Sequence, residues 1–151
     1  MDWTCQRLQT LAPLALYQAL ALRSKVFVVE QQCVYLDPDG LDLVAWHLLG
    51  FDAAGELQAC ARLLPPHSKG PDQACPVIGR VVVALQARSH GQGRALMRQA
   101  MSDCARLWPG QDIALSAQAH LQQFYASFGF LPVSGVYSED GIDHIDMQRA
   151  H

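Results

Sequence analysis

The fold is decided by two neighbouring stretches, Val77-Ile78-Gly79-Arg80-Val81-Val82-Val83-Ala84-Leu85 and Arg88-Ser89-His90-Gly91-Gln92-Gly93-Arg94-Ala95-Leu96-Met97. The first is rich in β-branched residues and predicts a strand that is buried on both faces. The second is a turn with two glycines that opens a helix. Such a turn leaves backbone N–H groups without carbonyl partners, and together with the helix dipole they favour a phosphate or pyrophosphate. We therefore predict that Arg88–Arg94 binds a phosphorylated cofactor.

Two common nucleotide-binding loops do not fit these glycines. A dinucleotide-binding fold needs G-x-G-x-x-G directly after its strand, but Gly91-Gln92-Gly93 is followed by Arg94-Ala95-Leu96 and the third glycine is missing. A Walker A loop needs G-K-[ST], which this turn lacks. The turn therefore belongs to another class of phosphate-binding site.

The composition predicts one globular domain that spans residues 1–151. The chain is 50% hydrophobic and 17% charged with a net charge of −3, so disorder and a nucleic-acid partner are disfavoured. The apolar segment Leu11–Leu22 is too short to cross a bilayer and has no basic leader, so we expect no membrane association. The five cysteines include no C-x-x-C pair, which argues against both a disulfide framework and a metal site. A cytoplasmic protein without a metal is expected.

Hydrophobic periodicity and turn residues predict a mixed α/β chain with helices on the faces of one sheet. A first helix is predicted from a Thr10 cap through Pro13 to about Ser24, with an apolar face of Leu14, Leu16, Tyr17, Leu20 and Ala21. A short extended run, Val26–Val29, follows and ends at Glu30. Further strands are expected at 44–51, 57–64, 77–85, 112–118, 131–137 and 142–149, and helices at 92–108 and 119–128.

The spacing Arg88-x-x-Gly91-x-Gly93 matches R/Q-x-x-G-x-G/A, the pyrophosphate motif of the Gcn5-related N-acetyltransferases (GNAT). The segment Phe124-Tyr125-Ala126-Ser127-Phe128-Gly129-Phe130 resembles the F-Y-x-x-x-G-F segment near the end of that fold. The whole chain resembles the ElaA-type branch of the family, through Arg23-x-x-Val26-Phe27-Val28-Val29-Glu30-Gln31, 46–50, 118–125 and 140–145. The resemblance implies the GNAT fold: a mixed, mostly antiparallel central sheet with flanking helices, in which strands 77–85 and 112–118 splay apart.

The resemblance also implies an acyl-CoA-dependent N-acetyltransferase that moves an acetyl group from acetyl-CoA to an amine by direct attack in a ternary complex. The backbone of Val81, Val82 and Val83 would lie along the pantetheine arm and polarise the thioester carbonyl. The pyrophosphate would be held by the turn residues Arg88, Ser89, His90, Gly91, Gln92, Gly93 and Arg94. Free CoA would be the co-product.

Acetyl transfer to an amine needs a group that accepts a proton and a group that protonates the departing thiolate. Tyr125 matches the position of the tyrosine that often serves as the acid in this family. The candidates for the base are Glu30, His47, His120 and His144, because a carboxylate at the edge of buried structure or an imidazole near neutral pKa suits the task.

The acceptor is a small-molecule or peptide amine that the sequence does not name. Trp46 and His47 are candidates for lining its pocket. Arg62 and Arg80 lie inside apolar strands, where an arginine usually pairs with a carboxylate or points to solvent. A clamp for a carboxylate of the substrate is the alternative. The acidic cluster Asp37, Asp39 and Asp42 is either a solvated turn or a site that favours a cationic amine.

Two alternatives come from other functional classes. One is a non-catalytic module that binds acyl-CoA and reports it to a partner. The other is an acyl-transfer synthase related to signal-lactone enzymes, suggested by Arg23-x-x-Val26-Phe27, although the short chain and the acetyltransferase turn argue against it. Exposed strand edges make a homodimer plausible.

Overall fold

The computed structural model describes all of residues 1–151, and eight strands form one mixed sheet. The order across the sheet is β1-β2-β3-β4-β5-β8, with β6 and β7 both paired to the outer edge of β8. Every pairing is antiparallel except that of β4 with β5. The strands are β1 (Asp2–Arg7), β2 (Trp46–Phe51), β3 (Leu57–Leu64), β4 (Val77–Val83), β5 (Ile113–Gln118), β6 (Leu131–Pro132), β7 (Tyr137–Glu139) and β8 (Ile142–Arg149). The predicted mixed and mostly antiparallel sheet is confirmed.

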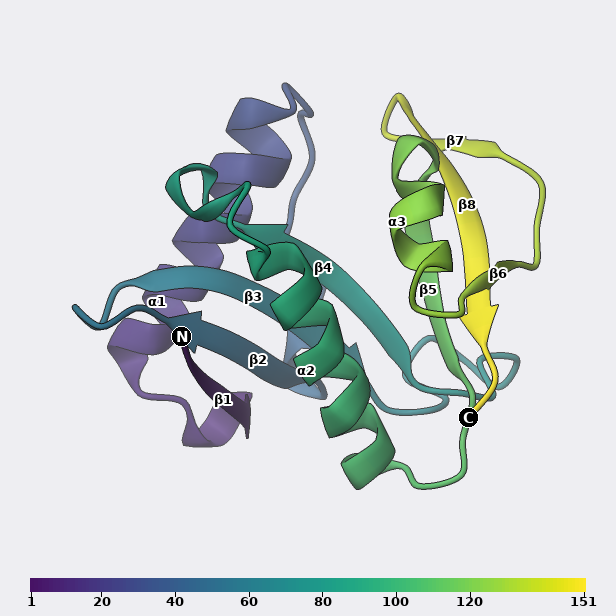
Figure 1. Ribbon diagram of the computed structural model, residues 1–151, viewed down its shortest axis with the longest axis horizontal. Coiled ribbons are helices and arrows are strands. Elements are labelled where there is room, and N and C mark those ends of the chain that lie inside the picture. The colour runs from purple at the N-terminus through teal and green to yellow at the C-terminus, as the bar shows by residue number, and fades with distance from the viewer.

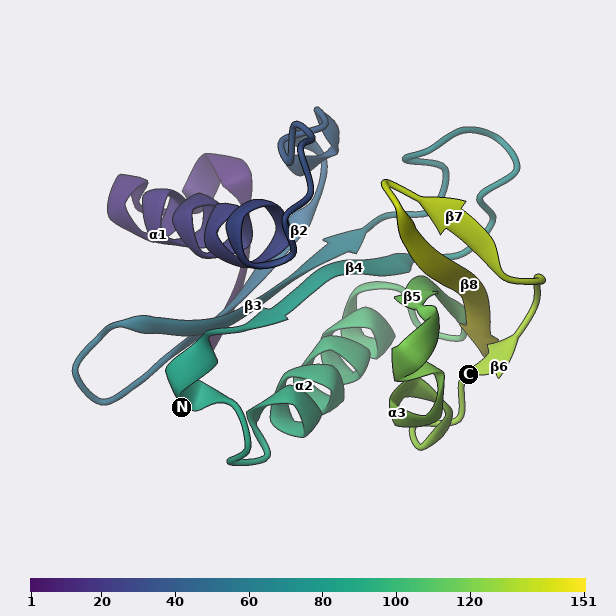
Figure 2. The ribbon, with the colours of Figure 1, turned by 90° about the horizontal axis from the view of Figure 1, so that it is seen from above.

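Helices cover both faces of this sheet. Helix α1 (Pro13–Arg23) continues into the π-helix η2 (Ser24–Glu30) on one face, whereas α2 (Gln92–Leu107) and α3 (Gln122–Ala126) lie on the other, as Figure 2 shows. Short 3-10 turns are η1 (Leu8–Thr10), η3 (Leu41–Leu43), η4 (Leu85–Ala87) and η5 (Ala119–Leu121). No helix combines the length and the apolar character that a membrane span requires.

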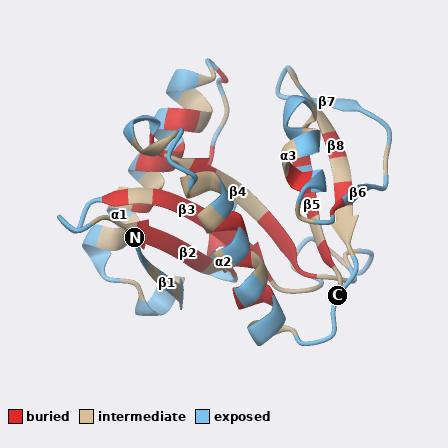
Figure 3. Cartoon of the chain, viewed as in Figure 1, coloured by how far each residue is buried: buried red, intermediate tan, exposed pale blue.

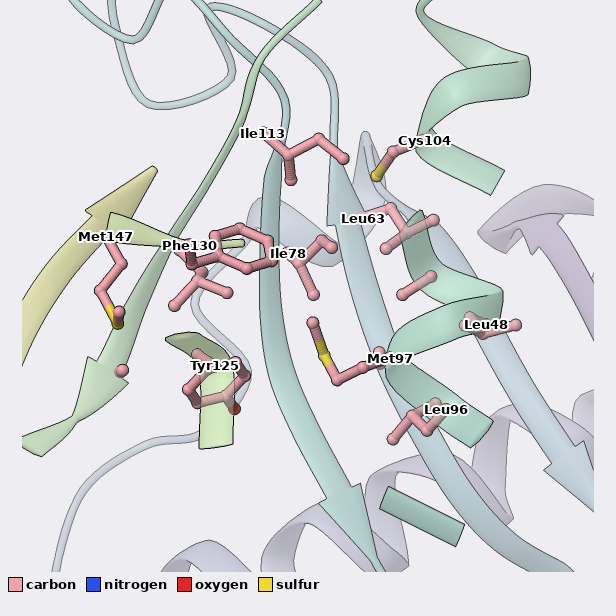
Figure 4. Packing of buried hydrophobic residues seen from close by; sticks show 14 of the residues in the cluster. Leu48, Leu63, Ile78, Leu96, Met97, Cys104, Ile113, Tyr125, Phe130 and Met147 are labelled. Carbon is pink, nitrogen blue, oxygen red and sulfur yellow. The ribbon is translucent and has the colours of Figure 1, made fainter. Parts of the chain in front are cut away.

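The main hydrophobic core lies between the sheet and the α2–α3 face. Leu96, Met97, Ala100 and Cys104 of α2 repeat with helical spacing and pack against β3, β4 and β5 (Figure 4). A second, smaller core joins α1 and η2 to the other face of the sheet. Figure 3 shows the resulting buried band along β2, β3 and the inner side of α2. Burial of each large aliphatic side chain stabilises the folded state by roughly 1.5–3 kcal/mol.

Strands β4 and β5 touch at one end only. Their single paired position is Val77 with Ala114, and the strands diverge from there (Figure 1). Beyond this point Arg80 and Val81 of β4 together lie opposite Ala61 of β3, which is a bulge, and Arg80 has a φ of +51°. A bulge bends its strand, and here it accompanies the divergence that the resemblance implied.

Three local predictions at the N-terminal end are wrong, and one strand was not predicted. Strand β1 was not predicted, because it is short and has only two apolar residues, Trp3 and Cys5, which pack on the core. The run Val26–Val29 is helical, not extended, since Val26 continues the buried side of α1 and tertiary packing outweighs β-propensity. Thr10 does not cap α1: its Oγ1 donates to the carbonyl of Arg7, and Ala12 is the N-cap residue. The predicted apolar face of the helix is also wrong, because Leu14 and Tyr17 are exposed and Ala19, Leu22 and Arg23 are buried.

Two strand predictions also differ from the structure. The expected strand 131–137 is two short strands, β6 and β7, which pair with separate parts of β8. The strand predicted at 77–85 ends at Val83, and it is not buried on both faces, since its middle residues Gly79, Arg80 and Val81 are partly exposed. This exposure arises because β5 diverges from β4 and does not cover these residues.

Candidate active site

The divergence of β4 and β5 opens a cavity of about 770 Å³. One side is formed by β4 and by the loop between β3 and β4. The other side is formed by β5, η5, Tyr125 of α3 and the β7–β8 turn. The end of η2 and the segment that follows it complete the lining. The cavity therefore reaches from Arg88, the first residue of the turn before α2, to the C-terminal hairpin.

The glycine turn presents free backbone donors at the start of α2. Gly91 is the N-cap residue with a φ of +74°, and no side chain caps this helix. The amides of Ser89, His90 and Gly91 donate no backbone hydrogen bonds. The first-turn amides of α2 likewise have no carbonyl within the helix. Successive free N–H groups at a helix N-terminus form a site for an anion, so the turn has the donors that a pyrophosphate needs.

The two arginines of the turn are engaged by other parts of the chain. Arg88 donates from Nε to the carbonyl of Val83 at 3.0 Å, and its Nη1 and Nη2 both donate to the carboxylate of Glu30. Arg94 donates to Ser127 Oγ at 3.1 Å and lies over the rings of Phe124 and Phe128 of the α3 region. The turn is thus tied both to β4 and to the opposite half of the sheet.

The edge of β4 that faces the cavity is unpaired. The amide of Ala84 donates to the carbonyl of Gln58 in β3 at 2.7 Å. By strand alternation, the N–H and C=O groups of Val83 and Val81 therefore point to the opposite edge. Strand β5 pairs with β4 only at Val77. Val81, Val82 and Val83 all line the cavity, and the side chain of Val82 packs in the second core. The amides of Val81 and Val83 on this edge are available to a ligand, whereas the carbonyl of Val83 accepts from Arg88.

Tyr125 carries a phenol into the cavity. Its side chain is 7% exposed and packs edge-on against the rings of Phe124 and Phe130. Figure 4 shows the ring on the β4 side of α3. The hydroxyl makes no hydrogen bond within the chain although the residue lines the cavity, and burial raises the pKa of Tyr125 to about 12. The phenol is therefore held in its protonated form.

His144 reaches the same cavity from β8. Its Nδ1 lies 2.7 Å from the carbonyl oxygen of Ile142, and its ring stacks on Tyr137. Because a carbonyl only accepts hydrogen bonds, Nδ1 carries the proton of the neutral ring and Nε2 has a free lone pair. Nε2 lies 3.8 Å from a carboxylate oxygen of Glu139. The ring is thus fixed in one orientation and one tautomer.

The other candidate bases differ in their surroundings. Glu30 lines the cavity, but its hydrogen bond with Arg88 and the charge of that residue hold its pKa below the usual value. His120 lines the cavity from η5 and makes no hydrogen bond that would orient its ring. His47 is buried, lies 3.0 Å from the carbonyl of Asp42, and has a lowered pKa because burial disfavours its charged form.

Trp46 and His47 do not reach the cavity. Both lie on β2, which is separated from the cavity by β3 and β4. Trp46 packs on the main core and beneath the guanidinium of Arg7. The prediction that these two residues line an acceptor pocket finds no support in this arrangement.

The acidic cluster is neutralised by three arginines. The expected pairing of Arg62 and Arg80 with carboxylates is confirmed, whereas the part of Arg23 and the identity of the aspartates were not predicted. Arg23 is buried and pairs with Asp37 and Asp42, Arg62 pairs with Asp39 and Asp42, and Arg80 pairs with Asp37 and Asp39. Burial alone would raise the pKa of Asp39, but the hydrogen bond and charge of Arg62 outweigh it and lower the pKa to about 2. The cluster is neither a solvated turn nor a free site for a cationic amine. The signal in the sequence was the position of Arg62 and Arg80 inside apolar strands.

Comparison with known proteins gives a consistent result. The family model "Acetyltransferase (GNAT) domain" matches residues 47–150. Protein ElaA of Escherichia coli is 46% identical over 99% of this chain and 96% of its own length. The crystal structure of an acyl-CoA N-acyltransferase from Pseudomonas aeruginosa superposes with a TM-score of 0.91 at 46% identity, over 99% of this chain and 100% of that one. The crystal structure of E. coli ElaA gives a TM-score of 0.90 at 45% identity, over 98% of both chains.

Proposed function

Because the chain belongs to the GNAT acetyltransferase family, we propose that it transfers an acetyl group from acetyl-CoA to an amine by direct attack. The observation that carries this proposal is the position of Tyr125. Its hydroxyl has no hydrogen-bond partner and a pKa of about 12, and the residue lines the same cavity as the free edge of β4. A protonated phenol in this place suits a group that delivers a proton to a leaving thiolate.

The residues of the cofactor turn fit a CoA molecule. The free amides of Ser89, His90 and Gly91 and the first turn of α2 would hold the pyrophosphate. Arg94 would add positive charge, and Arg88 would do so on release from Glu30. The β4 edge at Val81 and Val83 would bond to the pantetheine arm and polarise the thioester carbonyl. Bound acetyl-CoA supplies the acetyl group as an activated thioester.

Among the candidate bases, the contacts favour His144. Nε2 of His144 accepts the proton that the amine releases as its nitrogen bonds to the acetyl carbon. Tyr125 donates its hydroxyl proton to the sulfur as the carbon–sulfur bond breaks. Glu30 is less suited because Arg88 lowers its basicity, and His120 is less suited because nothing orients its ring.

The test is a thiol-release assay with acetyl-CoA and a panel of amines, applied to His144→Gln and His120→Gln in parallel. We expect His144→Gln to lower kcat by about 100-fold, in the range of general base catalysis, and His120→Gln to have little effect. The opposite ranking would assign the base to His120. Tight CoA binding without acetylation of any amine would instead favour a non-catalytic acyl-CoA-binding module.

A further inference from the structure

We propose that the acceptor is an amine that also carries a carboxylate, and that Arg80 and Lys69 bind this carboxylate. This inference rests on the proposed function, because it names the class of substrate for the same cavity. It is carried by the distribution of charged groups around the cavity and by the way in which Arg80 is held.

The two sides of the cavity carry opposite charges. Arg80 of β4 and Lys69 of the β3–β4 loop line one side, whereas Glu139 and Asp140 line the other at the β7–β8 turn, beside His144. Two sides of opposite sign favour a ligand that is itself dipolar. An ammonium or amine is drawn to the side that holds His144, and an anionic group is drawn to the side that holds Arg80.

The ion pairs of Arg80 leave one positive charge, that of Lys69, uncancelled on this side of the cavity. Asp37, Asp39 and Asp42 are matched in number by Arg23, Arg62 and Arg80, so this network has no net charge. Lys69 lies in addition to it, and the ammonium of Lys69 pairs with no carboxylate. A cationic group of a substrate finds no free carboxylate on this side of the cavity, whereas an anionic group finds unpaired donors.

The guanidinium of Arg80 is fixed with one nitrogen free. Nε donates to Asp37 Oδ1 at 2.8 Å and Nη2 to the Asp37 carbonyl at 3.0 Å, while Nη1 donates no hydrogen bond within the chain. The guanidinium carbon of Arg80 lies 5.9 Å from the centre of the Tyr35 ring, and the Arg80 side chain is 24% exposed. Because the guanidinium is already oriented, an anion that binds Nη1 loses little side-chain entropy.

The backbone at Arg80 is strained in a way that places this side chain. A φ of +51° is unusual for a residue with a Cβ, and Arg80 adopts it at the bulge of β4. Such strain persists where the surrounding contacts hold it, and it gathers at functional sites. Here the ion pairs with Asp37 and Asp39 hold it, and the result is a cation on the lining of the cavity.

Matched pairs of amines test the inference. L-phenylalanine is compared with phenethylamine, 4-aminobutyrate with propylamine, and 6-aminohexanoate with pentylamine, so that each pair differs by one carboxylate. Binding to the CoA-loaded protein is measured by titration calorimetry, and acetylation by thiol release. We expect the carboxylate member of at least one pair to bind about ten-fold more tightly, as charge-assisted hydrogen bonds predict, and to have a correspondingly lower KM.

Two variants locate the effect, and a third controls for it. Lys69→Gln and Arg80→Gln are expected to raise KM for the amine with a carboxylate about five- to ten-fold, with kcat nearly unchanged. The KM for the matched amine without a carboxylate should stay the same. Lys25→Gln removes the only other lysine, which is exposed on η2 and outside the cavity, and is expected to change nothing. Because Arg80 also anchors Asp37, its variant is checked for folding, whereas Lys69 is exposed and its variant decides the question alone.

The outcomes separate this inference from the proposed function. Equal or weaker binding of the carboxylate member in every pair, or no change in Lys69→Gln, overturns the inference even if amines are acetylated. Preferred binding of the carboxylate member without acetylation of any amine supports the inference and contradicts the proposed function.

Discussion

Arg88 and Glu30 form a forked ion pair at the edge of the cavity, in which both terminal nitrogens of the guanidinium donate to one carboxylate. The two residues are 58 positions apart in the sequence. The pair joins the end of η2 to the turn before α2. As a result, a carboxylate of the protein occupies the arginine that the motif assigns to a phosphate.

Glu30→Gln is therefore expected to strengthen CoA binding several-fold. The substitution removes a negative charge near the proposed phosphate site and releases Arg88 for the ligand. Titration calorimetry with CoA measures the change. The kcat is expected to stay within a few-fold of the wild-type value, since Glu30 is not the proposed base. A fall in kcat of about 100-fold, as expected for loss of a general base, would return Glu30 to that role.

Tyr125→Phe is expected to lower kcat by about 100-fold, as removal of a general acid predicts. The CoA affinity and the melting temperature should change little, because the hydroxyl makes no hydrogen bond within the chain. Since the pKa of Tyr125 is about 12, ionisation of this residue should cause no loss of activity up to about pH 10. An unchanged kcat would show that another group protonates the thiolate.

Gly93→Asp is expected to weaken CoA binding by about 100-fold or more, since it sets a carboxylate against the phosphates. Its fold should persist, because an acidic residue in the first turn of a helix is favourable by about 0.3–1 kcal/mol. Gly93→Ala is the matched control: an added Cβ would lie 3.6 Å from the Phe124 ring, an ordinary contact. Gly91 serves less well, because its φ of +74° disfavours any side chain. Retained micromolar CoA binding by Gly93→Asp would contradict the placement of the pyrophosphate.

Asp42→Asn is expected to destabilise the protein by about 3 kcal/mol, the usual cost of removing one partner from a buried ion pair. Asp42 accepts two hydrogen bonds from Arg23 and one from Arg62, and all three residues are buried. Urea denaturation measures the free energy of unfolding. Asp143→Asn, an exposed position on β8 without side-chain hydrogen bonds, is the control and should stay within about 0.5 kcal/mol. Equal stability of the two variants would mean that the network contributes nothing.

The same network predicts loss of stability in acid. The pKa of Asp39 is about 2 and that of Asp42 is also lowered, both from an ordinary value of 3.8. A carboxyl whose pKa is depressed by folding stabilises the protein above its unfolded pKa, and this stabilisation is lost as the pH falls towards the folded pKa. We therefore expect the free energy of unfolding to decline between about pH 4 and pH 2, with a smaller decline in Asp42→Asn. The pH dependence of urea midpoints is the measurement.

Much of the architecture was accessible from local patterns. The strands at 57–64 and 142–149 and the helix from Gln92 followed from periodicity and from the glycines of the turn, because these depend on residues close in sequence. The segment Val26–Val29 shows where prediction from local patterns fails. A β-branched run favours a strand in isolation, but contact of Val26 with the second core kept the chain helical.

By itself, the sequence determined the glycine turn before α2, since free amides and glycine conformations at Ser89–Gly93 are properties of a few consecutive residues. It also determined the mixed sheet through its order of helices and strands. Only the tertiary structure decided which charges are free. Ion pairs join residues that are 14 to 43 positions apart, between the arginines Arg23, Arg62 and Arg80 and the aspartates Asp37, Asp39 and Asp42. Another pair joins Glu30 to Arg88. Pairing over such separations depends on how strands and loops meet in space, which no short stretch of chain encodes.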